Sequence, residues 1–318
     1  MERWMSGFAA EINGPMVAVR AVHFAATAVI AGALMFRAVV VDSAMRGEDK
    51  ARLIVCNQIR RLAWIALALS VVSAALWLLL QSSAMSGQTY LEAMASGALF
   101  TVLDDTQFGW VFEVRLALAI ALAICLVLDR RPWPRWFALG AAQCLVAAIA
   151  WTGHAASTPF KLGYLHLTAD ALHLCAAAAW TGGLAALVLL LTDVNPARMS
   201  SSIRLDAVRR FSALGMVGVA TLLVSGIINA WILVGSFRAL FKTDYGWVLM
   251  AKLAIFAVMV AFAAVNRFWL MPRLGAQPDA AVVRNLRRNS MIEFALASAV
   301  FAAVGVLGTQ HPAAHFMN

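Results

Sequence analysis

Residues 245–254 read YGWVLMAKLA, and residues 108–117 read FGWVFEVRLA. Each segment opens with an aromatic residue followed by Gly-Trp-Val, carries a basic residue six positions after the glycine, and continues with Leu-Ala. Each segment also begins a long apolar run. This match between two distant parts of the chain indicates an internal duplication.

Further pairs occur in the same order along the two halves of the chain. His23 precedes Gly32 by nine positions, and His173 precedes Gly182 by nine positions. Two similar segments end later apolar runs, TGHAAS at 152–157 and TQHPAA at 309–314. The sequence therefore predicts two four-helix repeats. Because an even number of spans separates them, the repeats should be parallel, with a pseudo-two-fold axis along the membrane normal.

The composition is that of a polytopic membrane protein. Of the 318 residues, 63% are hydrophobic and 13% are charged, and the mean hydropathy is +0.81. Soluble domains are about 45–50% apolar and about 25% charged. A membrane-spanning helix needs about 20 mostly apolar residues. We predict an all-α fold with eight transmembrane helices, at roughly 17–41, 61–81, 109–128, 136–152, 165–191, 210–234, 246–270 and 290–308.

The basic residues indicate the orientation. Most of the 25 lysines and arginines fall in the first, third, fifth and seventh connections or at the helix ends beside them. Connections rich in Lys and Arg face the cytoplasm, so both termini should be periplasmic. The net charge of +9 then reflects the orientation of the chain in the membrane. We therefore expect the lipid bilayer as a partner and no nucleic acid.

The predicted domain organisation follows the repeats. Residues 1–135 hold the first three helices of repeat one, with an interfacial segment at 88–106 on the outer face. Residues 136–160 hold its fourth helix, and residues 161–318 hold repeat two. Apolar residues recur at helical spacing within 88–106, which indicates a helix lying at the membrane surface.

Histidines gather at the outer end of the predicted bundle, and none lies in the cytoplasmic connections. His166, Asp170 and His173 fall at i, i+4 and i+7 and share one helix face. Ionisable residues inside spans mark functional sites, and imidazole binds copper, zinc and iron. The candidate metal ligands are therefore His23, His154, His166, Asp170, His173 and His311. We expect His154, His166 and His311 at the mouth, and the other three deeper, between the repeats.

Structural roles are alternatives for several of these polar groups. Asp170 aligns with Arg20 in the repeat, so the two could form an ion pair. Arg115 and Lys252 are expected to extend toward the outer interface. Asn229 and Asn266 are interpreted as hydrogen-bonding groups between helices.

The motifs resemble those of the copper resistance protein CopD family. The matching segments lie at 152–157 (TGHAAS), 170–184 (DALHLCAAAAWTGGL), 209–231 (RRFSALGMVGVATLLVSGIINAW) and 243–256 (TDYGWVLMAKLAIF). The resemblance implies a bacterial inner-membrane protein that is not an enzyme. It also implies that the protein takes copper ions from the periplasm toward the cytoplasm, with a separate periplasmic partner resembling CopC.

A b-type haem protein is the alternative. Histidines at matched depth in a membrane protein can be axial ligands of haem iron. His23 paired with His173, or each of them paired with the later histidine of its own repeat, His154 or His311, would then serve electron transfer or a haem-linked oxidoreductase.

Overall fold

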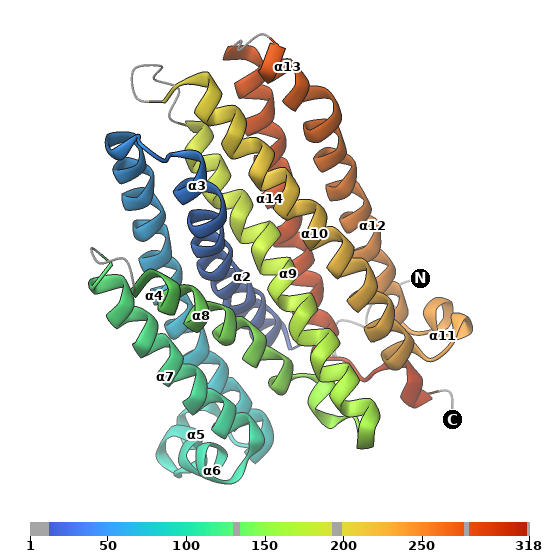
Figure 1. Ribbon diagram of the computed structural model, residues 1–318. Coiled ribbons are helices and arrows are strands. Elements are labelled where there is room, and N and C mark those ends of the chain that lie inside the picture. Colours follow the sequence, from blue (N-terminus) through green and yellow to red (C-terminus); the bar gives the residue numbers. More distant parts are fainter. Residues whose placement is uncertain (1–12, 130–133, 193–198, 277–279, 317–318) are drawn as a thin grey trace.

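The computed structural model describes residues 13–129, 134–192, 199–276 and 280–316, and the secondary structure of these residues is entirely helical (Figure 1). Seven helices in the described part of the chain are long and apolar enough to cross a membrane. They are Gly14–Ala44, Asp49–Ser86, Gln107–Val127, Phe160–Thr192, Ser201–Val234, Asp244–Ala276 and Ala280–Leu307.

Two of these spans change helix type along their length. The first consists of α2 (Gly14–Phe36), the π-helix η1 (Arg37–Val41) and α3 (Asp42–Ala44). The sixth consists of α12 (Asp244–Val265), the π-helix η4 (Asn266–Leu270) and α13 (Met271–Ala276). The other five spans are single α-helices: α4 (Asp49–Ser86), α7 (Gln107–Val127), α9 (Phe160–Thr192), α10 (Ser201–Val234) and α14 (Ala280–Leu307).

The segment predicted as the fourth span is shorter than the others. It forms α8 (Pro134–Ala147), which continues directly into the 3-10 helix η2 (Ala148–Thr152). The α-helical part, at about 1.5 Å per residue, extends for about 21 Å. A second 3-10 helix, η3 (His154–Ser157), then leads into α9.

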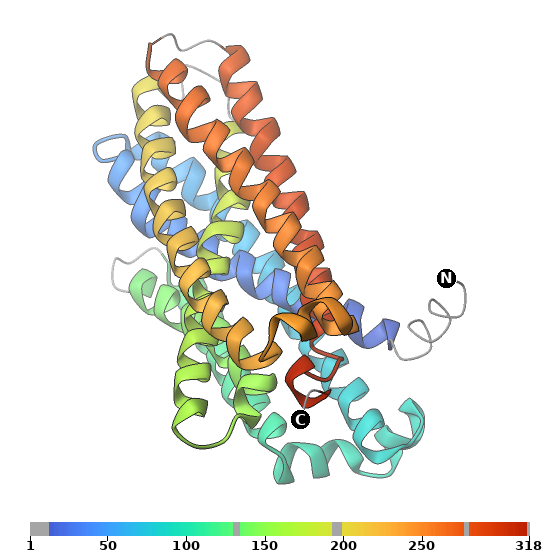
Figure 2. The same cartoon turned by 90° about the vertical axis from the view of Figure 1, so that its right-hand side faces the viewer.

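Helices α2 and α9 form the centre of the bundle, and the other long helices surround them (Figures 1 and 2). The short helices α5 (Tyr90–Ala95), α6 (Ala98–Asp105) and α11 (Phe237–Lys242) lie toward the lower end of Figure 1, α5 and α6 on the left and α11 on the right, and α13 lies at the upper end. We call these two ends the α11 end and the α13 end. The predicted interfacial segment at 88–106 is thus helical, as α5 and α6.

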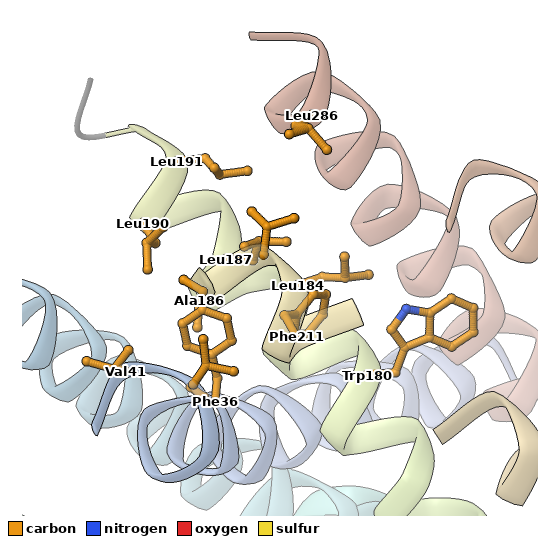
Figure 3. Packing of buried hydrophobic residues seen from close by; sticks show 14 of the residues in the cluster. Phe36, Val41, Trp180, Leu184, Ala186, Leu187, Leu190, Leu191, Phe211 and Leu286 are labelled. Carbon is orange, nitrogen blue, oxygen red and sulfur yellow. The ribbon is translucent and has the colours of Figure 1, made fainter. Parts of the chain in front are cut away.

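The central helices pack tightly because their contact surfaces carry small residues. Gly32 of α2 faces Gly182 of α9, and a methyl group on either would collide with backbone atoms of the other helix. Toward the α13 end, Phe36, Trp180, Leu184 and other large apolar side chains of α2, α9, α10 and α14 fill the interior (Figure 3).

The repeated motif has a local structural role at the start of α7 and α12. Thr106 and Thr243 precede these helices, and each threonine hydroxyl accepts a hydrogen bond at 3.0 Å from the backbone N–H of the following glycine, Gly109 or Gly246. A side chain on either glycine would collide with carbonyl oxygens of the preceding short helix. The motif therefore lets α6 and α11 fold back closely against α7 and α12.

Several helices extend beyond the predicted spans at the α13 end. Helix α4 begins at Asp49 rather than near 61, and α14 begins at Ala280 rather than near 290. Hydropathy falls at charged residues, but Lys, Arg and Glu are good helix formers, so the helix continues where the apolar run stops. Ion pairs stabilise this end, including Arg37 with Asp129 at 2.6 Å and Arg52 with Asp42 at 2.8 Å.

Candidate functional site

Four of the six predicted ligands line one cavity near the α11 end of the bundle. This cavity, which we call the histidine cavity, has a volume of about 350 Å³ and lies among α9, α10, α12 and α14. His154, His166, Asp170 and His173 line it. The face that His166, Asp170 and His173 were predicted to share belongs to α9 and is thus turned toward a hollow in the protein.

The ring of His173 is oriented by α10. Its Nδ1 lies 3.0 Å from Ser225 Oγ. The Ser225 hydroxyl donates its proton to the Thr221 carbonyl oxygen at 2.6 Å, so the hydroxyl oxygen accepts the Nδ1 proton. Nε2 is then an unprotonated nitrogen on a ring that lines the cavity. This is the tautomer that metal-binding histidines adopt, with the second nitrogen fixed by a hydrogen bond.

His166 is oriented in the same manner by the turn before α9. Its ring is 1% exposed, and Nδ1 lies 2.7 Å from Thr158 Oγ1. The Thr158 hydroxyl donates to the His154 carbonyl oxygen at 3.3 Å, so it too accepts from Nδ1. Because His166 also lines the cavity, its Nε2 is a second imidazole nitrogen suited to bind a cation there.

His154 belongs to the connection η3 rather than to a long helix. Its Nε2 lies 3.4 Å from the Leu307 carbonyl oxygen, which can only accept, so Nε2 carries the proton. The ring packs edge-on against Tyr245 with centroids 6.5 Å apart. His154 therefore connects η3 to the ends of α14 and α12.

Asp170 is held by an amide rather than by Arg20, the alternative partner. Its Oδ1 accepts from Asn229 Nδ2 at 3.2 Å, as an interhelical role for Asn229 predicts, while the Asn229 Oδ1 is buried without a hydrogen-bond partner. Within the described residues, no ion pair joins Asp170 to Arg20. The Arg20 guanidinium instead lies 4.9 Å from the ring of Trp77.

His23 lies outside the histidine cavity and lines a different hollow, beside α4 and α7. Its Nδ1 is 3.1 Å from the Ser70 carbonyl oxygen and 2.9 Å from Ser73 Oγ, so Nδ1 is the protonated nitrogen. Its Nε2 receives a hydrogen bond from the guanidinium of Arg115. The expectation that Arg115 extends to the outer interface is wrong, because its side chain is buried against His23.

His311 follows α14 and is exposed at the α11 end, outside the lining of the histidine cavity. The six predicted residues are therefore divided: four share a cavity, one has its own hollow, and one lies on the surface. Among the described residues, no three His, Cys, Asp or Glu side chains are grouped closely enough to hold one metal ion together. The four residues that line the cavity therefore share a hollow without forming a cluster of three ligands.

Sequence reasoning missed two residues of the cavity wall. Lys252, expected to extend toward the interface, lines the histidine cavity together with Tyr245. Both belong to the repeated aromatic-Gly-Trp-Val motif and its basic residue. The alignment of Lys252 with Arg115 was the available signal, because it placed both residues at equivalent positions of the two predicted repeats.

Comparisons with known proteins cover most of the chain. The family described as Copper resistance protein D matches residues 205–307, and the family described as the Copper resistance protein D-like N-terminal domain matches residues 11–164. No solved structure matches the chain.

Three relatives extend the similarity over longer stretches. Copper resistance protein D of Pseudomonas syringae pv. tomato is 30% identical over 79% of this chain and 82% of its own length. Inner membrane protein YebZ of Escherichia coli (strain K12) is 28% identical over 93% of this chain and 98% of its own length. Copper transport protein CutJ of Bacillus subtilis (strain 168) is 30% identical over 77% of this chain, which covers 46% of that protein.

Proposed function

The chain belongs to the copper resistance protein D family and is a multi-pass protein of the inner membrane, and on that premise we propose that it transports or handles copper ions as cargo. Copper would enter the histidine cavity from the periplasm and move toward the cytoplasm. The observation that carries this proposal is the oriented Nε2 of His173, which faces a cavity also lined by His154, His166 and Asp170.

The proposed orientation places the α11 end in the periplasm. The α13 end carries most of the basic residues, which are enriched on the cytoplasmic side of membrane proteins. With α8 and η2 counted as an eighth crossing, the chain would begin and end on the periplasmic side. The five residues of η2 add about 2 Å each and bring this crossing to about 31 Å, close to the thickness of the hydrocarbon core.

The two halves of the chain support the proposed duplication through equivalent contacts. His23 is bound by Ser73 of α4, and His173 is bound by Ser225 of α10. Each serine in turn donates to the carbonyl oxygen four residues earlier in its own helix. Gly32 and Gly182, each nine residues after its histidine, face one another at the centre of the bundle.

The halves differ at the second nitrogen of each histidine. In the first half, Arg115 donates to Nε2 of His23, so this nitrogen has no lone pair left for a cation. In the second half, Lys252 occupies the equivalent position of the motif but makes no hydrogen bond to His173 within the described residues. We infer that the first half is a structural copy and that the second half binds the cargo.

The donor set suits copper in either oxidation state. Imidazole nitrogen binds both Cu(I) and Cu(II), whereas carboxylate and carbonyl oxygen alone would favour magnesium or calcium. Because the described residues form no group of three such ligands, the cavity would hold an ion with few bonds, which favours passage over storage. A periplasmic copper-binding protein resembling CopC would deliver the ion at the α11 end, where His311 is exposed.

Copper binding by purified protein tests the proposal, with His173→Ala and His23→Ala as a matched pair. We expect His173→Ala to weaken copper binding at least ten-fold. His23→Ala should leave the affinity unchanged, because its Nε2 already accepts from Arg115. Equal binding by His173→Ala and the unaltered protein would contradict the proposal. Copper content of cells with and without the chain then distinguishes import from handling at the outer face.

The haem alternative loses one of its proposed axial ligands in this geometry. Nε2 of His23 is occupied by Arg115, and His23 and His173 line different hollows. A visible spectrum of the purified protein decides the question: a Soret band at one haem per chain would overturn the copper proposal.

A further inference from the structure

A second cavity lies on the α13 side of the histidine cavity. It has a volume of about 330 Å³ and is bordered by α9, α10, η4 and α14. We call it the Glu293 cavity, after the one carboxylate that lines it in the described part of the chain. Trp180 and Leu223 line both cavities, so these side chains separate the outer hollow from the inner one.

Glu293 is buried without a cationic partner. Its side chain belongs to the middle of α14 and is 2% exposed. Oε1 accepts a hydrogen bond from Asn266 Nδ2 at 2.7 Å. No ion pair reaches Glu293 among the described residues. An ionised carboxylate is costly in such surroundings, whereas a protonated one is neutral.

Two asparagine amides form a chain of hydrogen bonds that ends on the carboxyl group of Glu293. Asn289 Nδ2 donates to Asn266 Oδ1 at 2.9 Å, and Asn266 Nδ2 then donates to Glu293. The carboxyl group of Glu293 therefore accepts from an N–H donor at the end of this chain of amides. A metal ion would lack ligands here, because the described residues hold no group of three His, Cys, Asp or Glu side chains that could bind one. A protonated carboxyl group, by contrast, can accept from Asn266 through its carbonyl oxygen and donate its O–H to water in the cavity.

The charged groups around the cavity also disfavour a metal. Arg267 of η4 lines the cavity and donates to Ser212 Oγ of α10 at 2.7 Å. Helices α9 and α10 contribute no charged side chain to the lining, and on α14 the only charged group that lines it is Glu293. Among the described residues that line the cavity, Arg267 is thus the one permanently charged group, and its positive charge disfavours a metal cation. Asn266 is the first residue of the π-helix η4, and π-helical turns are frequent at functional sites.

We propose that Glu293, Asn266 and Asn289 form a proton-binding site in the inner half of the bundle, and that its proton exchanges with the cytoplasm through the Glu293 cavity. The step is an acid dissociation: the O–H bond of the carboxyl group breaks, the proton passes to water in the cavity, and the carboxylate remains. This inference rests on the proposed function in one respect, namely that copper movement past Trp180 is coupled to this proton.

Infrared difference spectroscopy tests the site without copper. The purified protein should show the carbonyl band of a protonated carboxyl group at neutral pH, and Glu293→Gln should remove it. This substitution keeps a carbonyl oxygen for Asn266, and thermal denaturation checks that it folds. Glu113→Gln is the matched control, because Glu113 also belongs to a span but is exposed. Absence of the band, or its survival in Glu293→Gln, would overturn the site.

Proteoliposomes with a pH-sensitive dye inside test the coupling. Copper added outside should change the internal pH with the unaltered protein, and Glu293→Gln should abolish this pH change. An unchanged proton signal in Glu293→Gln overturns the coupling. Vesicles that take up no copper with the unaltered protein overturn the proposed function instead, and the infrared band alone then decides whether Glu293 holds a proton.

Discussion

Gly32 of α2 and Gly182 of α9 meet backbone to backbone where the two central helices cross. A Cβ atom added to Gly182 would lie 2.9 Å from the Cα of Gly32 and still closer to the Ala28 carbonyl oxygen. Neither backbone can move without displacing the helices packed around it. Small residues at such crossings let membrane helices associate through close van der Waals contact.

Gly182→Ala should therefore destabilise the protein, although alanine is the better helix former. We expect a loss of about 1–3 kcal/mol in the free energy of unfolding, the usual cost of overpacking, measured by thermal denaturation in detergent. Gly140→Ala is the control, because nothing lies within 4 Å of the added methyl group. Its stability should rise slightly, and an equal loss in both variants would refute the close crossing.

The ion pair between Arg37 and Asp129 gives a second prediction. The two side chains are 10% and 8% exposed, and Arg37 Nη1 donates to both carboxylate oxygens of Asp129. Asp129→Asn would leave a buried guanidinium without a counter-charge, so the free energy of unfolding should fall by about 3–5 kcal/mol.

An exposed pair on α10 supplies the control for that measurement. Arg210 and Asp206 lie four residues apart and are 42% and 44% exposed. Asp206→Asn should cost only about 0.3–0.5 kcal/mol, as exposed helix pairs do. A similar loss of stability in both variants would show that the Arg37 pair is screened by solvent.

Most of the fold could be predicted from the sequence because the signal for membrane helices is local. Apolar runs identified the seven long helices, and helical spacing identified the shared face of His166, Asp170 and His173. The ends of the helices were less predictable, since charged residues end an apolar run without ending a helix. The short α-helical part of α8 also could not be predicted, because η2 continues the same apolar run.

The partners of each polar side chain could not be read from the sequence. The repeat pattern grouped His23 with His173, but the two histidines differ at Nε2. In His23 this nitrogen accepts a hydrogen bond from Arg115, which lies far along the chain on α7. Glu293 stands alone in an apolar stretch of α14, and its burial depends on the packing of η4 against that helix. Such contacts depend on helix rotation and packing order, which hydropathy does not specify.

Ser225 offers a test of the orientation of His173. If its hydroxyl fixes the Nδ1 proton, Ser225→Ala should weaken copper binding by about 10–100-fold, the usual effect of removing a hydrogen bond behind a metal-binding histidine. Isothermal titration of purified protein measures this affinity. Ser73→Ala removes the equivalent contact from His23 and should leave the copper affinity unchanged. Equal losses of affinity in the two variants would mean that copper binding does not depend on His173 more than on His23.

Trp180 separates the histidine cavity from the Glu293 cavity, so its removal should join them. The ring is 2% exposed and packs edge-on against Phe256 with centroids 5.9 Å apart. In a variant whose native cysteines are replaced by alanine, a cysteine at Ser290 reports on the inner cavity, which Ser290 lines. A small cationic thiol reagent that does not cross membranes, added to the periplasmic side, should label this cysteine several-fold faster in Trp180→Ala.

Trp231→Ala, at a side chain that is 68% exposed, should leave the rate unchanged. Because Trp180→Ala removes a large buried side chain, its thermal stability must be measured alongside, and Trp180→Phe should give an intermediate labelling rate. Labelling that is independent of residue 180 would mean that the two cavities are separated by other side chains.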